Sequence, residues 1–274
     1  MFRREFEGGS AEEVLRELSL FQNTDGGFGN AMEPDFRLPM SSAIATSIGL
    51  QYISQLKLGV LPVIAVQAMQ YLHATLDEAS LHWDPVPPIV DEYPRATWWE
   101  YENWRENSVN PGVELAGYLW EFPGILPDNV REQLTDQAFR HLAAQEEILE
   151  MHDLLCYMRF AERLPAAMSA DLYSQLDRHV EARVSRTRED FVEYGVRPEQ
   201  LAPSPTSHYY PLLRELVEES LDVTIETQAG DGSWRPRWSW GRFPLEWERA
   251  QREWRGILTL NGLRVLAAYG RIET

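Results

Sequence analysis

The sequence Gln22-Asn23-Thr24-Asp25-Gly26-Gly27-Phe28-Gly29 is the most informative segment of this chain for its fold. A degenerate copy returns near the other end as Gln228-Ala229-Gly230-Asp231-Gly232-Ser233-Trp234. Each copy reads glutamine, a short spacer, Asp-Gly, then Gly or Ser, then an aromatic residue. Each copy follows a segment with helical periodicity. After each copy come a loop and then a second segment with helical periodicity. A glycine turn that recurs between helices predicts stacked helical hairpins.

The composition of the turn has a physical reason. Glycine accepts positive φ, so the chain can reverse tightly between two helices, and Asp can bond nearby backbone donors. The aromatic residue can pack between hairpins, and the glutamine amide can tie neighbouring helix ends. A turn that is repeated at equivalent places in a chain is expected to have a structural role before a catalytic one. We therefore predict structural roles for Gln22, Phe28, Gln228 and Trp234.

The rest of the chain also reads as helical. Ser10 and Glu13 predict a capping box at the start of the first helix. Proline-rich segments are predicted as loops at 79–109, 189–206 and 229–246. No convincing strand is found, so the predicted fold class is all-α, with residues 1–274 in a single domain. Helices are predicted at 11–22, 42–56, 62–78, 111–121, 128–148, 149–164, 167–188, 209–228 and 247–269.

Charge and composition exclude some classes of partner. The formal net charge of −18 disfavours nucleic acid and anionic membrane surfaces. No apolar run approaches the roughly 20 residues that a spanning helix needs. The first residues lack the apolar core of a signal peptide, and Cys156 is the only cysteine. We therefore predict a cytoplasmic protein without a membrane span, and the sequence leaves its oligomeric state open.

The two glycine turns resemble the repeat shared by protein prenyltransferase β-subunits and squalene-type cyclases, known in the cyclases as the QW motif. Residues 42–56 stand where those families place an inner helix after the first turn. Thr259, Leu260 and Leu263 stand in the corresponding helix after the second turn. The chain is similar to bacterial squalene-cyclase-like proteins. The resemblance implies an (α/α) barrel or toroid of about six helical hairpins, with a cavity that opens at one end.

The catalytic candidates are two acidic pairs, Glu33/Asp35 and Asp91/Glu92. The chain has neither the Asp-x-Asp-Asp motif of the cyclases nor the Asp-Asp-x-x-Asp motif of class I prenyl enzymes. Either pair could hold a proton donor if it were buried, because desolvation raises the pKa of a carboxyl group. The alternative is that both are solvated loop charges.

We predict no cofactor and no metal. His152 and Cys156 lie four positions apart on a predicted helix and so share one face. A zinc site needs three or four ligands, and His208 would be the third. The alternative to this metal site is a buried structural cysteine beside a histidine at a helix end.

Aromatic and polar residues around the predicted loops are candidates for substrate binding. Aromatic side chains in a toroid cavity could accept an isoprenoid chain or stabilise a carbocation, and they also stack on sugar rings. The alternative is that the loops bury their own tryptophans. The candidates are Trp98, Trp99, Trp104, Asn110, Glu114, Tyr118, Asp153, Tyr157, Trp238, Trp247, Trp254 and Arg255.

The expected function is therefore the binding or conversion of a hydrophobic, isoprenoid-like small molecule in a central cavity. One alternative is a carbohydrate-processing enzyme, a glycosidase or lyase, which needs two carboxylates across a cleft. The other is a binding protein without catalysis that holds a ligand or partner at the mouth of the toroid.

Overall fold

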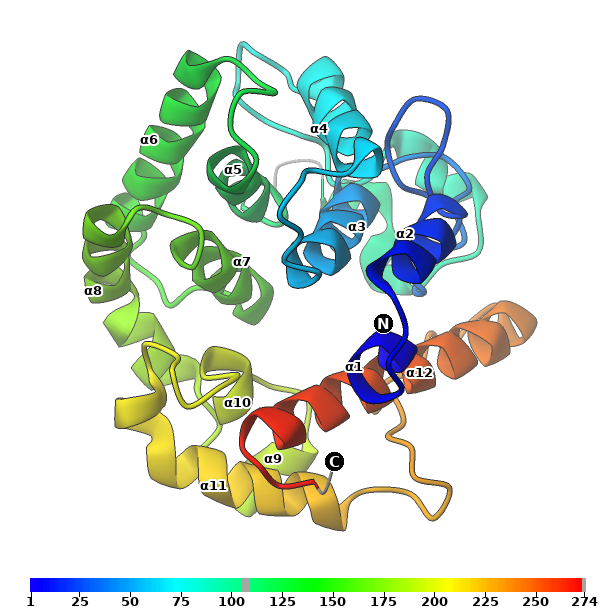
Figure 1. Cartoon of the computed structure of the whole chain (residues 1–274), viewed down its shortest axis with the longest axis vertical. Coiled ribbons are helices and arrows are strands. Elements are labelled where there is room, and N and C mark those ends of the chain that lie inside the picture. Colours follow the sequence, from blue (N-terminus) through cyan, green and yellow to red (C-terminus); the bar gives the residue numbers. More distant parts are fainter. Residues whose placement is uncertain (105–108, 273–274) are drawn as a thin grey trace.

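The computed structural model describes residues 1–104 and 109–272. The part of the loop 79–109 that falls at 105–108 lies outside the described residues. Within the described ranges the chain forms twelve α-helices and three 3₁₀-helices, and no strand (Figure 1). The predicted all-α class is confirmed.

The helices alternate with loops along the whole chain. The α-helices are α1 (Phe2–Phe6), α2 (Ala11–Ser19), α3 (Ala43–Gln55), α4 (Val63–Thr75), α5 (Gly112–Glu121), α6 (Asp128–Ala144), α7 (Met151–Ala161), α8 (Ala166–Arg183), α9 (Arg188–Val192), α10 (Pro198–Leu201), α11 (Tyr210–Glu226) and α12 (Pro244–Ala268). The 3₁₀-helices are η1 (Pro88–Glu92), η2 (Thr97–Trp99) and η3 (Tyr101–Asn103).

All nine predicted helices are present, with ends that differ by a few residues. The short helices α1, α9 and α10 were not predicted. Two of them lie in the segment 189–206, which was expected to be irregular. A single helical turn is too short to show periodicity, and prolines in this segment pointed to a loop. Pro198 in fact begins α10, because a proline at a first helical position loses no helix hydrogen bond.

The predicted capping box of α2 is confirmed. The backbone N–H of Glu13 donates to Ser10 Oγ at 3.1 Å, and the backbone N–H of Ser10 donates to the Glu13 carboxylate at 2.9 Å. Ser42 caps α3 through its side chain alone, and its Oγ accepts the backbone N–H of Ala45 at 3.2 Å. Both caps satisfy N–H groups that the first helical turn leaves without partners.

The two glycine turns are built by matching hydrogen bonds. Gln22 Nε2 donates to the carbonyl of Gly26 at 2.8 Å, and Gln228 Nε2 donates to that of Gly232 at 2.9 Å. The two glycines have φ of 90° and 80°. In each turn an aspartate accepts the backbone N–H of the residue two positions later. Gln22 also donates to the carbonyl of Ile64, which ties the first turn to α4.

The aromatic residue of each turn docks on the helix that follows. The backbone N–H of Phe28 donates to Thr46 Oγ1 at 3.0 Å, and that of Trp234 donates to Thr259 Oγ1 at 3.2 Å. Three residues after each threonine, a glycine lies against the aromatic ring. The turns therefore hold the helices α3 and α12 in the same way, at opposite ends of the chain.

The helices follow one another around the molecule in chain order. In Figure 1 α3, α5 and α7 lie nearer the centre of the view, and α4, α6 and α8 lie outside them. The contacts agree, because α3 packs on α4, α5 on α6, and α7 on α8. The helix α12 runs across the lower part of the view, with α1 beside it.

The main hydrophobic core runs through most of the helices, from Val14 in α2 to Leu266 in α12. A second, smaller cluster joins the loop after the first glycine turn to η1, η2 and the start of α12. Its buried members are Phe36, Leu38, Ile44, Val86, Val90, Ala96, Trp99, Trp240 and Ala250. This cluster places the N-terminal loop against the C-terminal helix.

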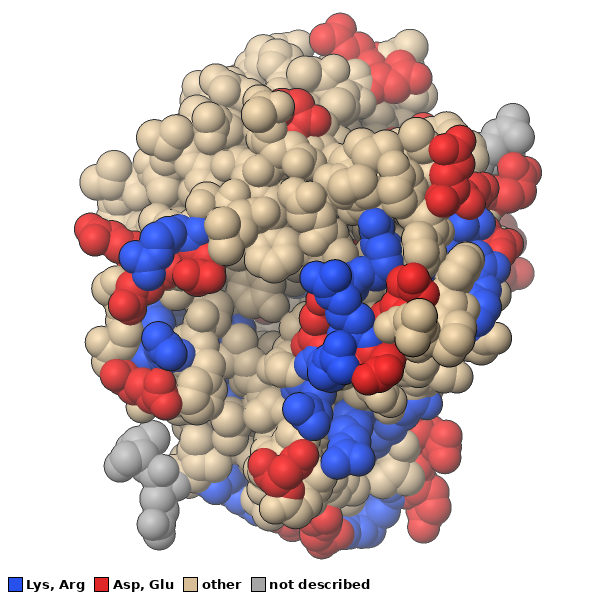
Figure 2. All heavy atoms as spheres, turned by 90° about the vertical axis from the view of Figure 1, so that its right-hand side faces the viewer, with Lys and Arg blue, Asp and Glu red and all other residues tan. Residues whose placement is uncertain are grey.

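An ion pair reinforces this junction. Arg37 Nη1 and Nη2 lie 2.5 and 3.0 Å from the two carboxylate oxygens of Glu253. Arginines gather on the face that Figure 2 turns toward the viewer, where α12 begins. Along α12, Arg249 pairs with Glu253 and Arg252 with Glu248, as expected for surface pairing.

Across 1–104 and 109–272, no helix combines the length and hydropathy that crossing a bilayer requires.

Candidate functional site

A cavity of about 910 Å³ lies among α3, α7, α12 and the loops around them. Both hydrophobic and polar side chains line it. They are Met32, Glu33, Pro34, Asp35, Ile44, Ile48, Gln51, Tyr52, Gln55, Trp98, Trp99, Asn103, Trp104, Asn110, Glu150, His152, Leu155, Arg159, Tyr194, Trp238, Trp254, Ile257, Asn261 and Arg264. A volume of this size accommodates a typical small-molecule ligand.

Asp35 is fixed on the cavity wall by three indole groups. The Nε1–H groups of Trp254 and Trp240 donate to Oδ1 at 2.7 and 2.8 Å, and that of Trp238 donates to Oδ2 at 3.0 Å. The residue is 4% exposed. Burial raises the pKa of Asp35, and although these hydrogen bonds and the charge of Arg37 lower it, the net shift is upward. Donors that converge on both oxygens favour the carboxylate form.

Glu33 lies beside this carboxylate and is also buried. Its Oε1 accepts the backbone N–H of Asp35 at 3.0 Å. Burial, together with the nearby charge of Asp35, raises the pKa of Glu33 to about 8. Two neighbouring buried carboxyl groups resist double ionisation, so near pH 7 the pair carries one proton. Because the indole N–H groups stabilise charge on Asp35, that proton resides on Glu33.

The cavity has two chemically different ends. On α3, Ile44 and Ile48 are followed by Gln51 and Gln55, so the lining changes from apolar to amide. With a rise of 1.5 Å per residue, this face spans about 16 Å. On α12, Trp254 and Ile257 are likewise followed by Asn261 and Arg264.

Hydrogen bonds distinguish the two ends of the cavity. Trp254 bonds to Asp35, whereas Gln51 and Arg159 both bond to Glu114. We call the first the acid end, which comprises Glu33, Asp35, Trp98, Trp99, Trp104, Trp238 and Trp254. We call the second the amide end, which comprises Gln51, Gln55, Arg159, Asn261 and Arg264.

A buried carboxylate supports the amide end from behind. Glu114 on α5 is 1% exposed and accepts Arg159 Nε at 2.6 Å and Gln51 Nε2 at 3.2 Å. The hydroxyl of Tyr118 donates to its other oxygen at 2.9 Å. These bonds hold Gln51 and Arg159 in place, and Arg159 keeps 32% of its side chain accessible.

A second group of titratable side chains lies on the acid side of the cavity. His152 Nδ1 is 3.0 Å from the Glu150 carboxylate, and its Nε2 is 2.9 Å from the Tyr194 hydroxyl. The ring of Tyr194 packs edge-on against Trp238, which bonds to Asp35. Burial raises the pKa of Glu150, but the hydrogen bond and charge of His152 lower it, and the net shift is downward.

The structure brings together half of the predicted site residues. Glu33 and Asp35 converge on the wall with several of the predicted aromatic residues. The predicted residues that line the cavity are Glu33, Asp35, Trp98, Trp99, Trp104, Asn110, Trp238 and Trp254.

The second acidic pair lies elsewhere. Asp91 is paired at 2.8 Å with Arg95, and Glu92 is exposed. Arg255 is paired with Asp231 at 3.6 Å on the surface, and Trp247 packs against Trp240. None of these four predicted residues is on the cavity wall.

The helical candidates Glu114, Tyr118, Asp153 and Tyr157 were expected to face the cavity and do not line it. Glu114 and Tyr118 bond to each other beneath the wall. The hydroxyl of Tyr157 donates to the carbonyl of Ala138 at 2.9 Å. Spacing of four residues identified a shared helix face correctly, but that face packs against a neighbouring helix.

Sequence reasoning missed all five residues of the amide end. Gln51, Gln55, Arg159, Asn261 and Arg264 are polar residues in helices, a pattern that usually marks a solvent-exposed face. A signal was present on α3, where the two glutamines continue the apolar stripe of Ile44 and Ile48. The apolar and the amide side chains of this helix face line the same cavity.

The residues considered for zinc do not converge. Cys156 Sγ lies 3.5 Å from Asn110 Oδ1, His152 lies between Glu150 and Tyr194, and His208 stacks on Tyr173 at 3.9 Å. Burial raises the pKa of the Cys156 thiol far above its ordinary value, which disfavours the thiolate that a metal requires. Over the described ranges, no three His, Cys, Asp or Glu side chains gather as metal ligands would.

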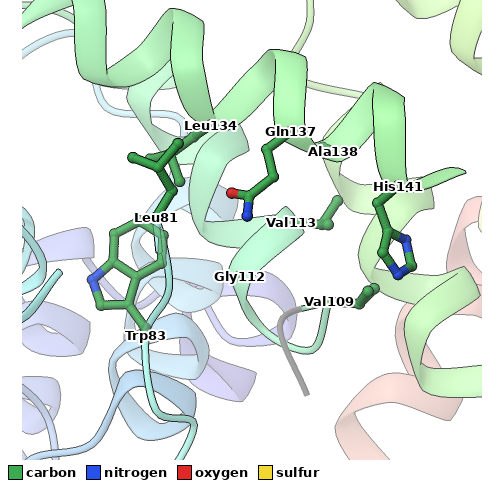
Figure 3. Close-up of a pocket in the computed structure, with 9 residues that line it drawn as sticks. All are labelled: Leu81, Trp83, Val109, Gly112, Val113, Leu134, Gln137, Ala138 and His141. Atoms are coloured by element: carbon green, nitrogen blue, oxygen red, sulfur yellow. The ribbon is translucent and has the colours of Figure 1, made fainter. Parts of the chain in front are cut away.

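A second cavity lies between α6 and the loop before α5, but it holds only about 20 Å³ (Figure 3). That is space for one water molecule. Its lining residues are Leu81, Trp83, Val109, Gly112, Val113, Leu134, Gln137, Ala138 and His141. It is too small for a substrate.

The resemblance to terpenoid cyclases and prenyltransferases stays a prediction. No protein-family model, curated protein or solved structure matches this chain.

Proposed function

We propose that this protein is an enzyme that binds a hydrophobic, isoprenoid-like small molecule in the 910 Å³ cavity and transfers a proton at Glu33. The observation that carries the proposal is the pair of Glu33 and Asp35 on an aromatic wall, in which Asp35 accepts hydrogen bonds from three tryptophan N–H groups. We further propose that the ring of helices is an (α/α) toroid formed by one domain, with this cavity at its mouth.

The two carboxyl groups have different parts in this chemistry. Glu33, with a pKa raised to about 8, keeps its proton near neutral pH and can serve as a general acid. While Glu33 holds the shared proton, the Asp35 carboxylate, oriented by its three indole donors, stabilises positive charge that develops on the ligand. A carboxyl group with this pKa is a weak acid, which suits protonation of an oxygen or nitrogen atom better than protonation of an isolated alkene.

The two ends of the cavity predict how the ligand lies. Its hydrophobic body packs against Trp98, Trp99 and Trp104 at the acid end, next to the proton donor. Its polar part reaches toward Gln55, Asn261 and the other amide-end side chains. The ligand is therefore amphipathic and about 15 Å long, by the rise of the lining helices.

The test is a mass-spectrometric screen of prenyl alcohols, prenyl carboxylic acids and triterpenoids against the purified chain. We expect a retained ligand, and turnover that Glu33→Gln abolishes while binding persists. Glu92→Gln, an exposed carboxyl group outside the cavity, is the matched control and should leave turnover unchanged. If no compound of these classes binds, the isoprenoid proposal is overturned.

A carbohydrate is the second candidate ligand, because five amide side chains line the cavity: Gln51, Gln55, Asn103, Asn110 and Asn261. Amides both donate and accept hydrogen bonds, as recognition of sugar hydroxyls requires, and tryptophans stack on sugar rings. Glu33 and Asp35 lie on the same wall, however, rather than across a cleft from each other. Binding of oligosaccharides but not prenyl compounds in the same screen would select this candidate.

A further inference from the structure

Glu150, His152 and Tyr194 form a hydrogen-bonded chain that the function proposed above does not use. The carboxylate of Glu150 lies 3.0 Å from His152 Nδ1, and the hydroxyl of Tyr194 lies 2.9 Å from Nε2. All three line the large cavity. They come from separate parts of the chain, because Glu150 caps α7 whereas Tyr194 follows α9.

The partners of His152 determine which ring nitrogen carries the proton. A carboxylate can only accept, so Nδ1 of His152 must be the donor toward Glu150. Nε2 is then unprotonated in the neutral ring and accepts the hydroxyl proton of Tyr194. Burial and the charges of Glu150, Asp35 and Glu33 raise the pKa of Tyr194 to about 12, so this hydroxyl holds its proton at neutral pH.

The same chain contains a useful comparison. His141 Nδ1 lies 3.1 Å from the hydroxyl of Tyr157, but the hydroxyl of Tyr157 donates to the carbonyl of Ala138. Tyr157 is fully buried, whereas Tyr194 is 59% exposed at the cavity. Of these two groups, the His152 group is the one that combines a carboxylate, an imidazole and an accessible hydroxyl in sequence. This is the arrangement of an orienting group, a base and an activated oxygen.

We propose that Glu150, His152 and Tyr194 form a proton relay that accepts a proton from a hydroxyl-bearing ligand at the Tyr194 oxygen. As the O–H bond of the ligand breaks, a new O–H bond forms at Tyr194, and the original hydroxyl proton of Tyr194 passes to Nε2 of His152. Glu150 stabilises the resulting imidazolium. Tyr194 is the catalytic residue, and Glu150 is a positioning residue.

This relay deepens the proposed function and rests on it for the substrate. Glu33 gives a proton to one atom of the ligand while Tyr194 takes a proton from a hydroxyl group, so the charge of the ligand is conserved. The ring of Trp238 lies between the two groups, touching Tyr194 and bonding to Asp35. A cavity with an acid and a base of this kind suits elimination, isomerisation or ring closure of a hydroxylated ligand.

The first test of the relay requires no ligand. Long-range ¹H–¹⁵N NMR correlations of the full chain report which ring nitrogen of His152 is protonated. We expect Nδ1–H, and we expect Glu150→Gln to reduce the population of that tautomer. A neutral ring protonated at Nε2 in the wild type would overturn the relay.

The second test measures the reactivity of the Tyr194 oxygen with N-acetylimidazole. In this reaction the bond from acetyl carbon to imidazole nitrogen breaks and a bond from acetyl carbon to the tyrosine oxygen forms. The tyrosine proton passes to His152, and the imidazole that leaves takes up a proton from water. Peptide mass spectrometry gives the acetylation rate of Tyr194 relative to Tyr210. We expect His152→Gln to lower this ratio at least about tenfold, the lower range of general-base effects.

Two further variants make the second test specific. Glu150→Gln should lower the ratio less than His152→Gln, because an amide still accepts the Nδ1–H but stabilises the imidazolium poorly. His73→Gln, which removes a histidine that does not line the cavity, should leave the ratio unchanged. Equal ratios in wild type and His152→Gln would overturn the relay and leave the proposal for Glu33 standing, since that proposal is tested by ligand turnover.

Discussion

Trp254 donates its indole N–H to Asp35 at 2.7 Å, although 219 positions separate the two residues in the chain. Together with Trp238 and Trp240, it brings the C-terminal part of the protein to the loop after the first glycine turn. Loss of this donor should therefore affect both stability and the acid pair.

We expect Trp254→Phe to lower the free energy of unfolding by about 1–3 kcal/mol, the range for hydrogen bonds to charged groups and buried acceptors. The change also removes part of the indole ring, so the loss includes packing as well as the N–H group. Urea denaturation of the wild type and the variant measures this loss of free energy. Trp247→Phe is the control, because Trp247 packs on Trp240 without a role at Asp35. Equal losses in the two variants would show that ring packing, not the hydrogen bond, holds α12.

Glu33 predicts a pH dependence of stability. Its pKa is about 8 in the folded protein and near 4.5 in the unfolded chain, so between these values the folded state binds the extra proton. Stability then falls as pH rises through this window, by up to on the order of 1 kcal/mol per pH unit. Glu33→Gln should flatten that slope in denaturation curves taken from pH 5 to 8. A slope identical to wild type would contradict the raised pKa.

The buried pair of Glu114 and Arg159 predicts a large single-variant effect. Arg159→Met leaves the carboxylate of Glu114 without its cation in a site that is 1% exposed, which should cost about 3–5 kcal/mol of stability. Adding Glu114→Gln removes the uncompensated charge and should restore much of the loss. A double-mutant cycle by denaturation checks this, and strictly additive losses would contradict the coupling.

The two glycine turns predict an asymmetric pair of effects. A Cβ at Gly49 would come within 2.7 Å of the Phe28 ring, whereas one at Gly262 would lie 3.3 Å from the Trp234 ring. We expect Gly49→Ala to destabilise the protein by about 1–3 kcal/mol, as overpacking does, and Gly262→Ala to cost less. Thermal denaturation of both variants tests the order. A larger loss for Gly262→Ala would show that the two turns are not packed as described.

The sequence predicted the scaffold better than the wall of the site. Helix positions and the Ser10 cap follow from local patterns, because periodicity and capping depend on residues close in the chain. Glu33 and Asp35 were identified as one of two acidic pairs in a chain that lacks the catalytic motifs of the cyclases and prenyl enzymes. Their burial was not predictable, since it depends on Trp238 and Trp240, more than 200 positions away.

The polar residues of the helices show more clearly how far the site can be predicted from sequence. Glu114 and Arg159 share one ion pair, yet only Arg159 reaches the cavity. The spacing of Glu114 and Tyr118 indicates one face of α5 but not which neighbour covers it. That choice depends on how α5 packs against α7, which no local pattern encodes. The chain Glu150–His152–Tyr194 was missed for the same reason, because a turn 42 positions away supplies the tyrosine.

The bonds from Asp35 to the C-terminal tryptophans have a consequence for synthesis of the protein. A ribosome that has made the first half of the chain has released Glu33 and Asp35, but not the three indoles that cover Asp35. Until the three indoles have been synthesised, both carboxyl groups remain hydrated and ionised near neutral pH, as in an ordinary loop. We therefore expect Glu33 to take up its proton only after the C-terminal tryptophans that bond to Asp35 have been translated.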